Sequence, residues 1–149
     1  MEITIAPLEQ RKEKWSDPAA LGFGRIFTDR MLVADWEKGR GWHDVRIEPY
    51  GPFNLEPAAM VLHYGQEIFE GLKAYRWEDG GIALFRPAMN LARLNRSAER
   101  LALPTVPEEL FLDGVDRLVE LEREWVPSSD GTSLYIRPTL IATEAALGV

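Results

Sequence analysis

The amino-acid sequence predicts an α+β domain, with a mostly antiparallel sheet and two helices packed on one of its faces. Short segments rich in apolar and branched residues occupy much of the stretch up to residue 85, and glycine- or proline-bearing connections separate them. Two segments with apolar residues three and four positions apart follow, as on helices that bury one side. A last strand-like segment comes after them. Strands grouped with a helix pair in this order predict an α+β layer arrangement.

Four strands are expected before the helices. The first covers residues 26–33 and the second 45–48, with a glycine-bearing turn between them that favours a hairpin. A third is expected over 69–77 and a fourth over 82–85, joined by the tight-turn sequence Glu-Asp-Gly-Gly. Residues 1–22 are mostly polar and are expected to form a lead-in to the domain.

Two helices and a final strand complete the prediction. The first helix is expected over 87–101, where a proline suits the first turn and the apolar residues lie three, four and three apart. Those residues are Leu91, Leu94, Ala98 and Leu101. The second helix begins at Pro107, with Glu108 and Glu109 in the first turn, where the helix dipole favours acids. The segment 133–142 is expected to return as a strand.

Composition excludes several classes of protein. The chain has 149 residues, a net charge of −7 and 46% hydrophobic residues, so it holds enough apolar material for a core and no basic surplus for nucleic acid. It contains no cysteine and two histidines, which excludes a disulfide scaffold and a cysteine-ligated zinc site. Neither a bilayer-spanning apolar run nor a secretory signal is evident, so we expect a cytoplasmic protein with no membrane partner.

The last predicted strand carries a candidate anion-binding face. Alternation places Tyr135, Arg137 and Thr139 on one face, and Leu134 and Ile136 on the other, toward the helices. A guanidinium fork matches a carboxylate, and a neighbouring phenol can add a directed hydrogen bond. A solvated sheet face with a surface ion pair is the alternative that this spacing leaves open.

Two other segments hold candidate binding residues. In the third predicted strand Phe69 and Gly71 share one face, where they could form a pocket wall with room for a ligand, although Gly71 could instead mark a bulge. On the first helix Arg86, Arg93 and Arg100 recur every seven residues. A phosphate partner would explain one of these arginines, and solvent explains the others better. The spacing alone names no activity.

Four separated stretches carry a family resemblance, in one order and spacing. The most specific is His63-Tyr64-Gly65 followed by Phe69-Glu70-Gly71-Leu72-Lys73-Ala74-Tyr75. The others are the stretch 27–32; residues 84–87 with Asn90, Arg93 and Ser97-Ala98; and Tyr135-Ile136-Arg137-Pro138-Thr139 with the residues up to 149. Together they resemble the signature of branched-chain amino acid aminotransferases, pyridoxal-phosphate enzymes of fold type IV. The similarity runs from about residue 21 to the end.

The resemblance implies roles for individual residues. Arg93 corresponds to the arginine that contacts the phosphate of pyridoxal 5'-phosphate. Arg137 corresponds to the residue that takes the side-chain carboxylate of glutamate or 2-oxoglutarate. The substrate pocket as a whole is implied to involve Tyr64, Phe69, Tyr135, Arg137 and, by a weaker match, Phe23. Leu147 and Val149 match a loop that closes the pocket of the neighbouring subunit, which implies a homodimer.

The resemblance also implies that part of the enzyme lies outside this chain. In the family the Schiff-base lysine belongs to a larger C-terminal domain, and none of the four lysines here corresponds to it. We therefore expect residues 23–149 to form a small domain that is incomplete at its C-terminal end, inactive alone and dependent on the rest of the polypeptide. Family members continue after residue 149 through one more strand of this domain, and without that strand the sheet is expected to have an unpaired edge.

Three interpretations remain open on sequence alone. The first is part of an aminotransferase that exchanges amino groups between leucine, isoleucine or valine and 2-oxoglutarate. The second keeps the fold but changes the substrate, to a D-amino acid aminotransferase or an aminodeoxychorismate lyase, against which the stretches 27–32 and 135–138 argue. The third is a non-catalytic binding module without the lysine domain. We prefer the first interpretation, the branched-chain aminotransferase, over the other two.

Overall fold

The computed structural model describes residues 2–17 and 21–148, and it is an α+β fold. Its strands are β1 (Thr4–Ile5), β2 (Arg30–Glu37), β3 (Gly41–Pro49), β4 (Glu67–Phe69), β5 (Leu72–Arg76), β6 (Ile82–Leu84), β7 (Leu134–Ile136) and β8 (Thr139–Ile141). Its helices are α1 (Met60–Tyr64), α2 (Pro87–Arg100) and α3 (Glu108–Leu121), with a short 3₁₀ turn at Arg123–Trp125. No helix within these described ranges is both long and apolar enough to cross a membrane.

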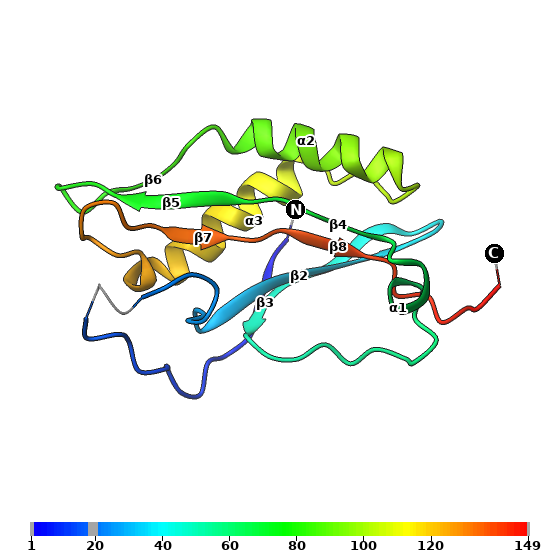
Figure 1. Cartoon of the computed structure of the whole chain (residues 1–149), viewed down its shortest axis with the longest axis horizontal. Coiled ribbons are helices and arrows are strands. Elements are labelled where there is room, and N and C mark those ends of the chain that lie inside the picture. The colour runs from blue at the N-terminus through cyan, green and yellow to red at the C-terminus, as the bar shows by residue number, and fades with distance from the viewer. Residues whose placement is uncertain (1, 18–20, 149) are drawn as a thin grey trace.

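The strands form three small sheets instead of one continuous sheet. The first has the strand order β1-β3-β2, the second pairs β4 with β8, and the third has the order β6-β5-β7. All pairs are antiparallel except β1 with β3. In Figure 1 α2 lies above β4 and β5, α3 passes behind β5 and β7, and β2 and β3 lie below. The expected helix pair on one face is confirmed.

Two strand regions are interrupted at the same level. The predicted strand 69–77 begins on the last residue of β4 and resumes as β5 after Glu70-Gly71, and the predicted strand 133–142 divides into β7 and β8 around Arg137-Pro138. The amide of Glu70 donates to the carbonyl of Pro138 at 2.9 Å, so one bond still crosses the gap. Pro138 has no N–H to return, which is why the ladder cannot continue through it.

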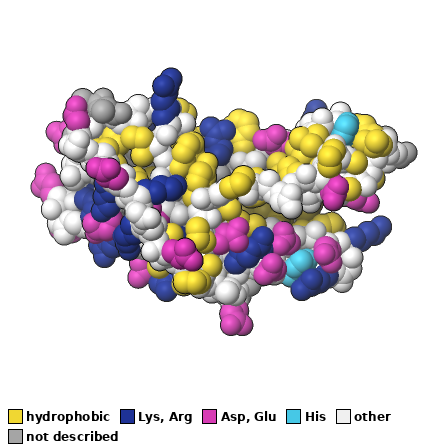
Figure 2. Space-filling view, turned by 90° about the horizontal axis from the view of Figure 1, so that it is seen from below, with side chains coloured by type: hydrophobic (Ala, Val, Ile, Leu, Met, Phe, Trp, Pro, Cys, Tyr) yellow, Lys and Arg dark blue, Asp and Glu magenta, His cyan; other side chains and the backbone are white. Residues whose placement is uncertain are grey.

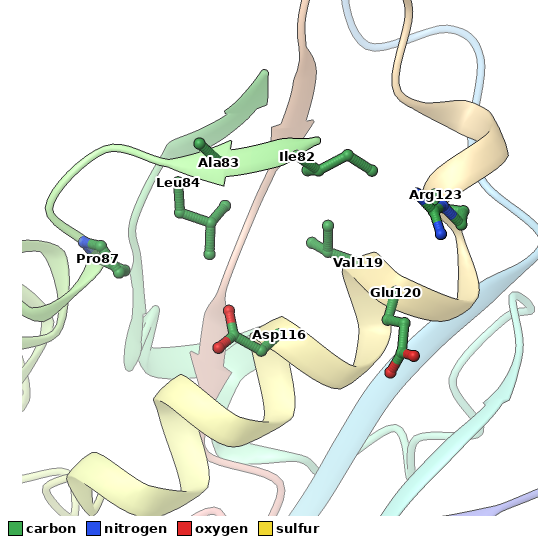
Figure 3. Close-up of a pocket in the computed structure, with 8 residues that line it drawn as sticks. All are labelled: Ile82, Ala83, Leu84, Pro87, Asp116, Val119, Glu120 and Arg123. Carbon is green, nitrogen blue, oxygen red and sulfur yellow. The ribbon is translucent and has the colours of Figure 1, made fainter. Parts of the chain in front are cut away.

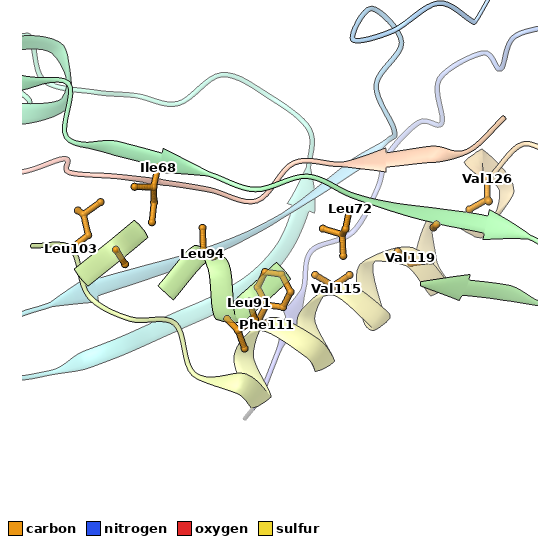
Figure 4. Packing of buried hydrophobic residues seen from close by; sticks show 11 residues of the cluster. Ile68, Leu72, Leu91, Leu94, Leu103, Phe111, Val115, Val119 and Val126 are labelled. Carbon is orange, nitrogen blue, oxygen red and sulfur yellow. The ribbon is translucent and has the colours of Figure 1, made fainter. Parts of the chain in front are cut away.

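The core lies between the broken strands and the two helices. Leu72 of β5 points into a cluster with Leu91 and Leu94 of α2 and Phe111 and Val115 of α3 (Figure 4), and all five are at most 6% exposed. On α2 the predicted residues Leu91, Leu94 and Ala98 are buried, whereas Leu101, predicted to share their face, follows the end of the helix and is 39% exposed. Burying each such side chain stabilises the fold by about 1.5–3 kcal/mol.

Helix α3 also rests on β2, and a glycine makes this contact possible. A Cβ built at Gly114 would lie 2.6 Å from Cδ2 of Leu32. Glycine costs a helix roughly 0.5–1 kcal/mol relative to alanine, so the close approach of the strand explains why the helix carries one here.

The first part of the chain departs from the expected polar lead-in. Thr4 and Ile5 form β1, which pairs in parallel with β3, and the first long strand begins at Arg30 instead of residue 26. The residues just before β2 pack through their rings: Phe27 stacks on Tyr50 with centroids 4.9 Å apart. The sequence pattern could not predict strand β1, because two residues are too few to show an alternation of apolar and polar side chains. It could not predict the stacking of Phe27 either, because this residue lies outside the strands.

Two buried carboxylates join the N-terminal segment to the end of α3. Glu122, 1% exposed, accepts from the amide of Asp29 at 2.8 Å and from Nη1 of Arg30 at 3.0 Å. Asp29 accepts from the amide of Lys12 at 2.8 Å and from Nε1 of Trp125 at 3.1 Å. Burial by itself would raise the pKa of Asp29, but these hydrogen bonds lower it below its ordinary value.

Replacing Glu122 by glutamine is expected to lower the free energy of unfolding by about 3 kcal/mol, because it leaves the buried Arg30 guanidinium without its counter-charge. Denaturant unfolding measures the change. The matched control is Glu120→Gln, which removes an exposed carboxylate paired with Arg117 at the same end of α3 and should change stability by less than about 1 kcal/mol. Equal losses in the two variants would contradict a special role for Glu122.

Candidate functional site

Arg137 lies between two aromatic rings at the break between β7 and β8. Its Cζ is 4.3 Å from the ring centroid of Phe69 and 5.2 Å from that of Tyr135. Phe23 meets Tyr135 edge-on, with centroids 5.0 Å apart. Four residues that the sequence analysis assigned to a substrate pocket therefore form one group, drawn from three distant segments. A guanidinium between ring faces is held by cation–π attraction and keeps its N–H donors free for an anion.

The predicted alternation along the two broken strands is confirmed. Leu134 and Ile136 pack against the core, while Tyr135 lies on the other face with Arg137. On β4 and β5, Phe69 is 57% exposed, whereas Glu70 and Leu72 are buried. The ladder break interrupts hydrogen bonding without reversing which residues face the core.

Gly71 supports the ring of Tyr135. A Cβ built at Gly71 would lie 2.8 Å from Cζ of Tyr135 and still closer to its hydroxyl, so no larger residue fits under the ring as it stands. The sequence left open whether this glycine marks a bulge or a wall beside a ligand. In the structure it allows the close approach of an aromatic side chain, which places the phenol beside Arg137.

Glu70 binds four donors behind this wall. Its carboxylate accepts from Nε and Nη2 of Arg93, from Nδ2 of Asn90 at 3.0 Å and from the amide of Gly71 at 3.1 Å. Asn90 also donates to the carbonyl of Gly71 at 3.1 Å. Chiefly because of the hydrogen bonds from Arg93, the pKa of Glu70 falls to about 2. The carboxylate is therefore ionised at neutral pH although it is 4% exposed.

Arg93 retains donors for a second anion. The pair with Glu70 uses Nε and Nη2, and a guanidinium has five N–H groups, so the Nη1–Nη2 edge remains available. The side chain is 61% exposed, and it borders a hollow of about 370 Å³ that Arg96, Ser97 and Arg100 also line. Three guanidinium groups around one hollow are a donor set that fits a phosphate dianion.

Tyr64 and Leu147 form a separate pair. Tyr64 ends α1, and its hydroxyl donates to the carbonyl of Leu147 at 2.6 Å. Both are exposed, at the end of the molecule where α1 and the C-terminal segment lie (Figure 1). The structure therefore joins Tyr64 to the C-terminal segment, whereas the other aromatic site residues gather around Arg137. Val149, the last predicted site residue, lies outside the described residues.

A larger hollow lies elsewhere and does not contain the predicted residues. It measures about 590 Å³ and lies between β6 and α3, with Ile82 and Leu84 facing Val119 (Figure 3). Its charged lining residues are Asp116, Glu120 and Arg123. None of the residues assigned to the site from sequence lines this hollow, and it has no aromatic wall, so the group around Arg137 remains the better candidate.

The face of the molecule that lies opposite α2 is partly apolar. Hydrophobic side chains gather across the upper half of this face, and acidic and basic ones are concentrated at its left end and lower half (Figure 2). Across the whole described chain, the exposed aromatic residues include Phe23, Phe27, Tyr50 and Phe53. Of the two aromatic residues that contact Arg137, Phe69 is 57% exposed and Tyr135 is half-buried.

Two residues that the sequence analysis left without a role belong to the site. Glu70 was quoted only as part of a motif, and Asn90 only as part of a matching stretch. A buried acid at an inward-facing strand position was the available signal, since Glu is almost never fully buried without a partner. The identity of that partner depends on how α2 packs on the strands, which spacing does not reveal.

Comparison with known proteins gives the same family. No protein-family model matches the chain. Branched-chain-amino-acid transaminase 1 of Bacillus subtilis (strain 168) is 59% identical over 138 residues, which is 93% of this chain and 38% of the relative. A probable branched-chain-amino-acid aminotransferase of Staphylococcus aureus (strain MRSA252) is 56% identical over 99% of this chain and 40% of the relative.

A solved structure agrees with these relatives. The T.th. branched-chain amino acid aminotransferase, complexed with N-(5'-phosphopyridoxyl)-L-glutamate, superposes with a TM-score of 0.55 and 31% identity. The match covers 68% of this chain and 32% of that chain. The fold is thus that of the small domain of fold-type IV aminotransferases.

Within that class, the chain belongs to the branched-chain amino acid aminotransferase family. It spans about two fifths of the length of the curated relatives that it matches.

Replacing Gly71 by alanine is expected to displace the Tyr135 ring and to lower the free energy of unfolding by about 1–3 kcal/mol through overpacking. Denaturant unfolding and a structure of the variant would measure both effects. The control is Gly51→Ala, because the nearest heavy atom to a Cβ there is the Pro49 carbonyl oxygen at 3.9 Å. An unmoved Tyr135 ring in the Gly71 variant would refute the contact.

Proposed function

We propose that this chain provides the substrate-binding and phosphate-binding wall of a pyridoxal-phosphate-dependent branched-chain aminotransferase. The proposed reaction transfers the amino group between leucine, isoleucine or valine and 2-oxoglutarate. The observation that carries the proposal is the position of Arg137 between the rings of Phe69 and Tyr135. The family of the relatives supports it.

This arrangement suits a pocket that must accept an apolar side chain and a charged one in turn. The rings of Phe69 and Tyr135 can exclude water around a leucine side chain, whose burial is worth about 1.5–3 kcal/mol. The Arg137 guanidinium can bind the side-chain carboxylate of glutamate through a charge-assisted hydrogen bond of about 1.5–3 kcal/mol. Because the two gains are similar, neither substrate excludes the other.

Arg93 is the proposed phosphate anchor for pyridoxal 5'-phosphate. Its free guanidinium edge and the arginine-lined hollow beside it support this role. A related structure contains a phosphopyridoxyl group joined to L-glutamate, which also supports the cofactor. When bound, the cofactor supplies an electron sink for the bonds to Cα, and the protein contributes binding and orientation.

We propose that the catalytic lysine lies in a larger domain outside this chain, so that residues 23–149 form an incomplete small domain without activity of their own. Lys73 is the lysine nearest the site in sequence, and it pairs across the ladder with Tyr135 on the exposed face. The resemblance does not assign the catalytic lysine to this position. The chain therefore orients the substrate and cofactor, while proton transfer at Cα belongs to the absent domain.

The pair of Tyr64 and Leu147 supports a second proposal about assembly. The resemblance assigns Leu147 to a loop that closes the pocket of a neighbouring subunit. Because the Tyr64 hydroxyl donates to the Leu147 carbonyl, we propose that Tyr64 holds this loop in place. The proposed assembly is a homodimer, and the proposed compartment is the cytoplasm. Phe23, which touches Tyr135, belongs to the pocket of its own subunit.

In the full-length enzyme, Arg137→Ala is expected to raise KM for 2-oxoglutarate roughly ten- to hundredfold, the value of one charge-assisted hydrogen bond. KM for leucine should change much less, because its side chain needs no cation. Steady-state kinetics with both substrates measure the ratio. Arg40→Ala, in the β2–β3 turn, is the control. An equal rise for both substrates would remove Arg137 from the carboxylate role.

In the same enzyme, Arg93→Ala is expected to weaken retention of pyridoxal 5'-phosphate by at least about tenfold, because a guanidinium–phosphate pair is lost. Dialysis followed by absorbance of the bound cofactor measures retention. Arg117→Ala removes an exposed arginine of α3 and should leave retention unchanged. Unchanged cofactor affinity in the Arg93 variant would refute its role as phosphate anchor.

A further inference from the structure

The Glu70 carboxylate is saturated with hydrogen bonds. Four donors reach it: two N–H groups of Arg93, the side-chain amide of Asn90 and the backbone amide of Gly71. An ionised carboxylate has about four lone-pair positions and no donor of its own, so it can satisfy all four. No neutral side chain of the same size can do this, since a glutamine amide would turn N–H groups toward one of these donors.

The pair with Glu70 decides how the Arg93 guanidinium is presented. Arg93 is on α2 and its side chain is 61% exposed, so without a partner it would sample many rotamers. Two parallel bonds to one carboxylate fix both the position and the plane of the guanidinium. The free Nη1–Nη2 edge of Arg93 is therefore held in a single orientation, ready for an anion.

The same carboxylate fixes the backbone under the substrate wall. Gly71 lies in the gap between β4 and β5, where no ladder bond is available to it. Its amide donates to Glu70, and its carbonyl accepts from Asn90. The Tyr135 ring rests on this glycine, and Arg137 lies beside the ring. A displacement of Glu70 would therefore be felt at both Arg93 and Tyr135.

We propose that Glu70 is a positioning residue that couples the phosphate-binding arginine, Arg93, to the substrate wall formed by Gly71 and Tyr135. The proposal rests on the proposed function of Arg93 and Arg137. Glu70 touches neither substrate nor cofactor in this arrangement, and it acts through the groups that it holds. Loss of its charge would weaken the bonds that hold the Arg93 guanidinium and the bond that holds the Gly71 amide.

The experiment uses the full-length enzyme with three variants. Glu70→Gln removes the charge, Glu70→Asp keeps the charge but shortens the side chain by one methylene, and Glu67→Gln is the control. Glu67 lies three residues earlier on β4 and is exposed, so it has the same charge change without the buried partners. The measurements are the affinity of the apoenzyme for pyridoxal 5'-phosphate, the ³¹P NMR signal of the bound cofactor, and KM for 2-oxoglutarate beside KM for leucine.

Glu70→Gln is expected to weaken cofactor affinity by roughly tenfold or more, the loss of one charge-assisted contact. It should also shift the ³¹P signal and raise KM for 2-oxoglutarate more than KM for leucine. Glu70→Asp should recover part of each effect, and Glu67→Gln should show none. A residue that only stabilised the fold would change the unfolding midpoint without moving the ³¹P signal of molecules that remain folded.

Unchanged cofactor affinity and an unchanged ³¹P signal in Glu70→Gln would overturn the proposal. If Glu70→Gln does not fold, the same two measurements on Glu70→Asp decide, with a shifted signal in support and an unshifted one against. The Arg93→Ala variant separates this proposal from the function on which it rests. When Arg93→Ala loses the cofactor and the Glu70 variants do not, only the coupling fails; when Arg93→Ala also binds normally, the phosphate role fails as well.

Discussion

The candidate site is built around a gap between two strand pairs, β4–β8 and β5–β7, at Glu70-Gly71 on one chain segment and Arg137-Pro138 on the other. Pro138 cannot donate to the facing strand, and Gly71 has its amide turned to a side chain instead of a ladder partner. At this gap the Tyr135 ring lies on Gly71, and Arg137 lies beside the rings of Phe69 and Tyr135. The register is the same on both sides, Phe69 with Thr139 and Leu72 with Ile136, so the residues keep the facing order of a continuous ladder.

A gap in a sheet leaves polar backbone groups to satisfy, and buried charge does this here. Glu70 and Asn90 bind both backbone groups of Gly71, and the charge of Glu70 is in turn compensated by Arg93. Burying a carboxylate is favourable only when it is paired and hydrogen-bonded. The same polar unit therefore stabilises the irregular backbone and reaches the surface hollow where a phosphate fits.

The sequence predicts the parts of this structure that depend on local periodicity. The core residues Leu91, Leu94 and Ala98 of α2 and the opposite faces of Leu134 and Tyr135 follow from spacing, whereas Leu101 does not, because the helix ends before it. The strand gap has a signal in Pro138, which cannot donate to a ladder, but the strand that faces this proline depends on the pairing and cannot be read from spacing. Pairings such as Glu70 with Arg93, or Tyr64 with Leu147, depend on how elements pack, and the two-residue strand β1 is too short to show a period.

The carboxylate of Glu122 and the backbone of Asp29 are 93 positions apart along the chain. A ribosome adds about 5–20 residues per second, so roughly 5–20 s separate the synthesis of these two partners. During that interval the hairpin of β2 and β3 has emerged, while the acceptor that fixes its beginning has not been made. The start of this hairpin therefore acquires its buried acceptor only after α2 and α3 have been synthesised, so this contact cannot help to form the hairpin on a growing chain.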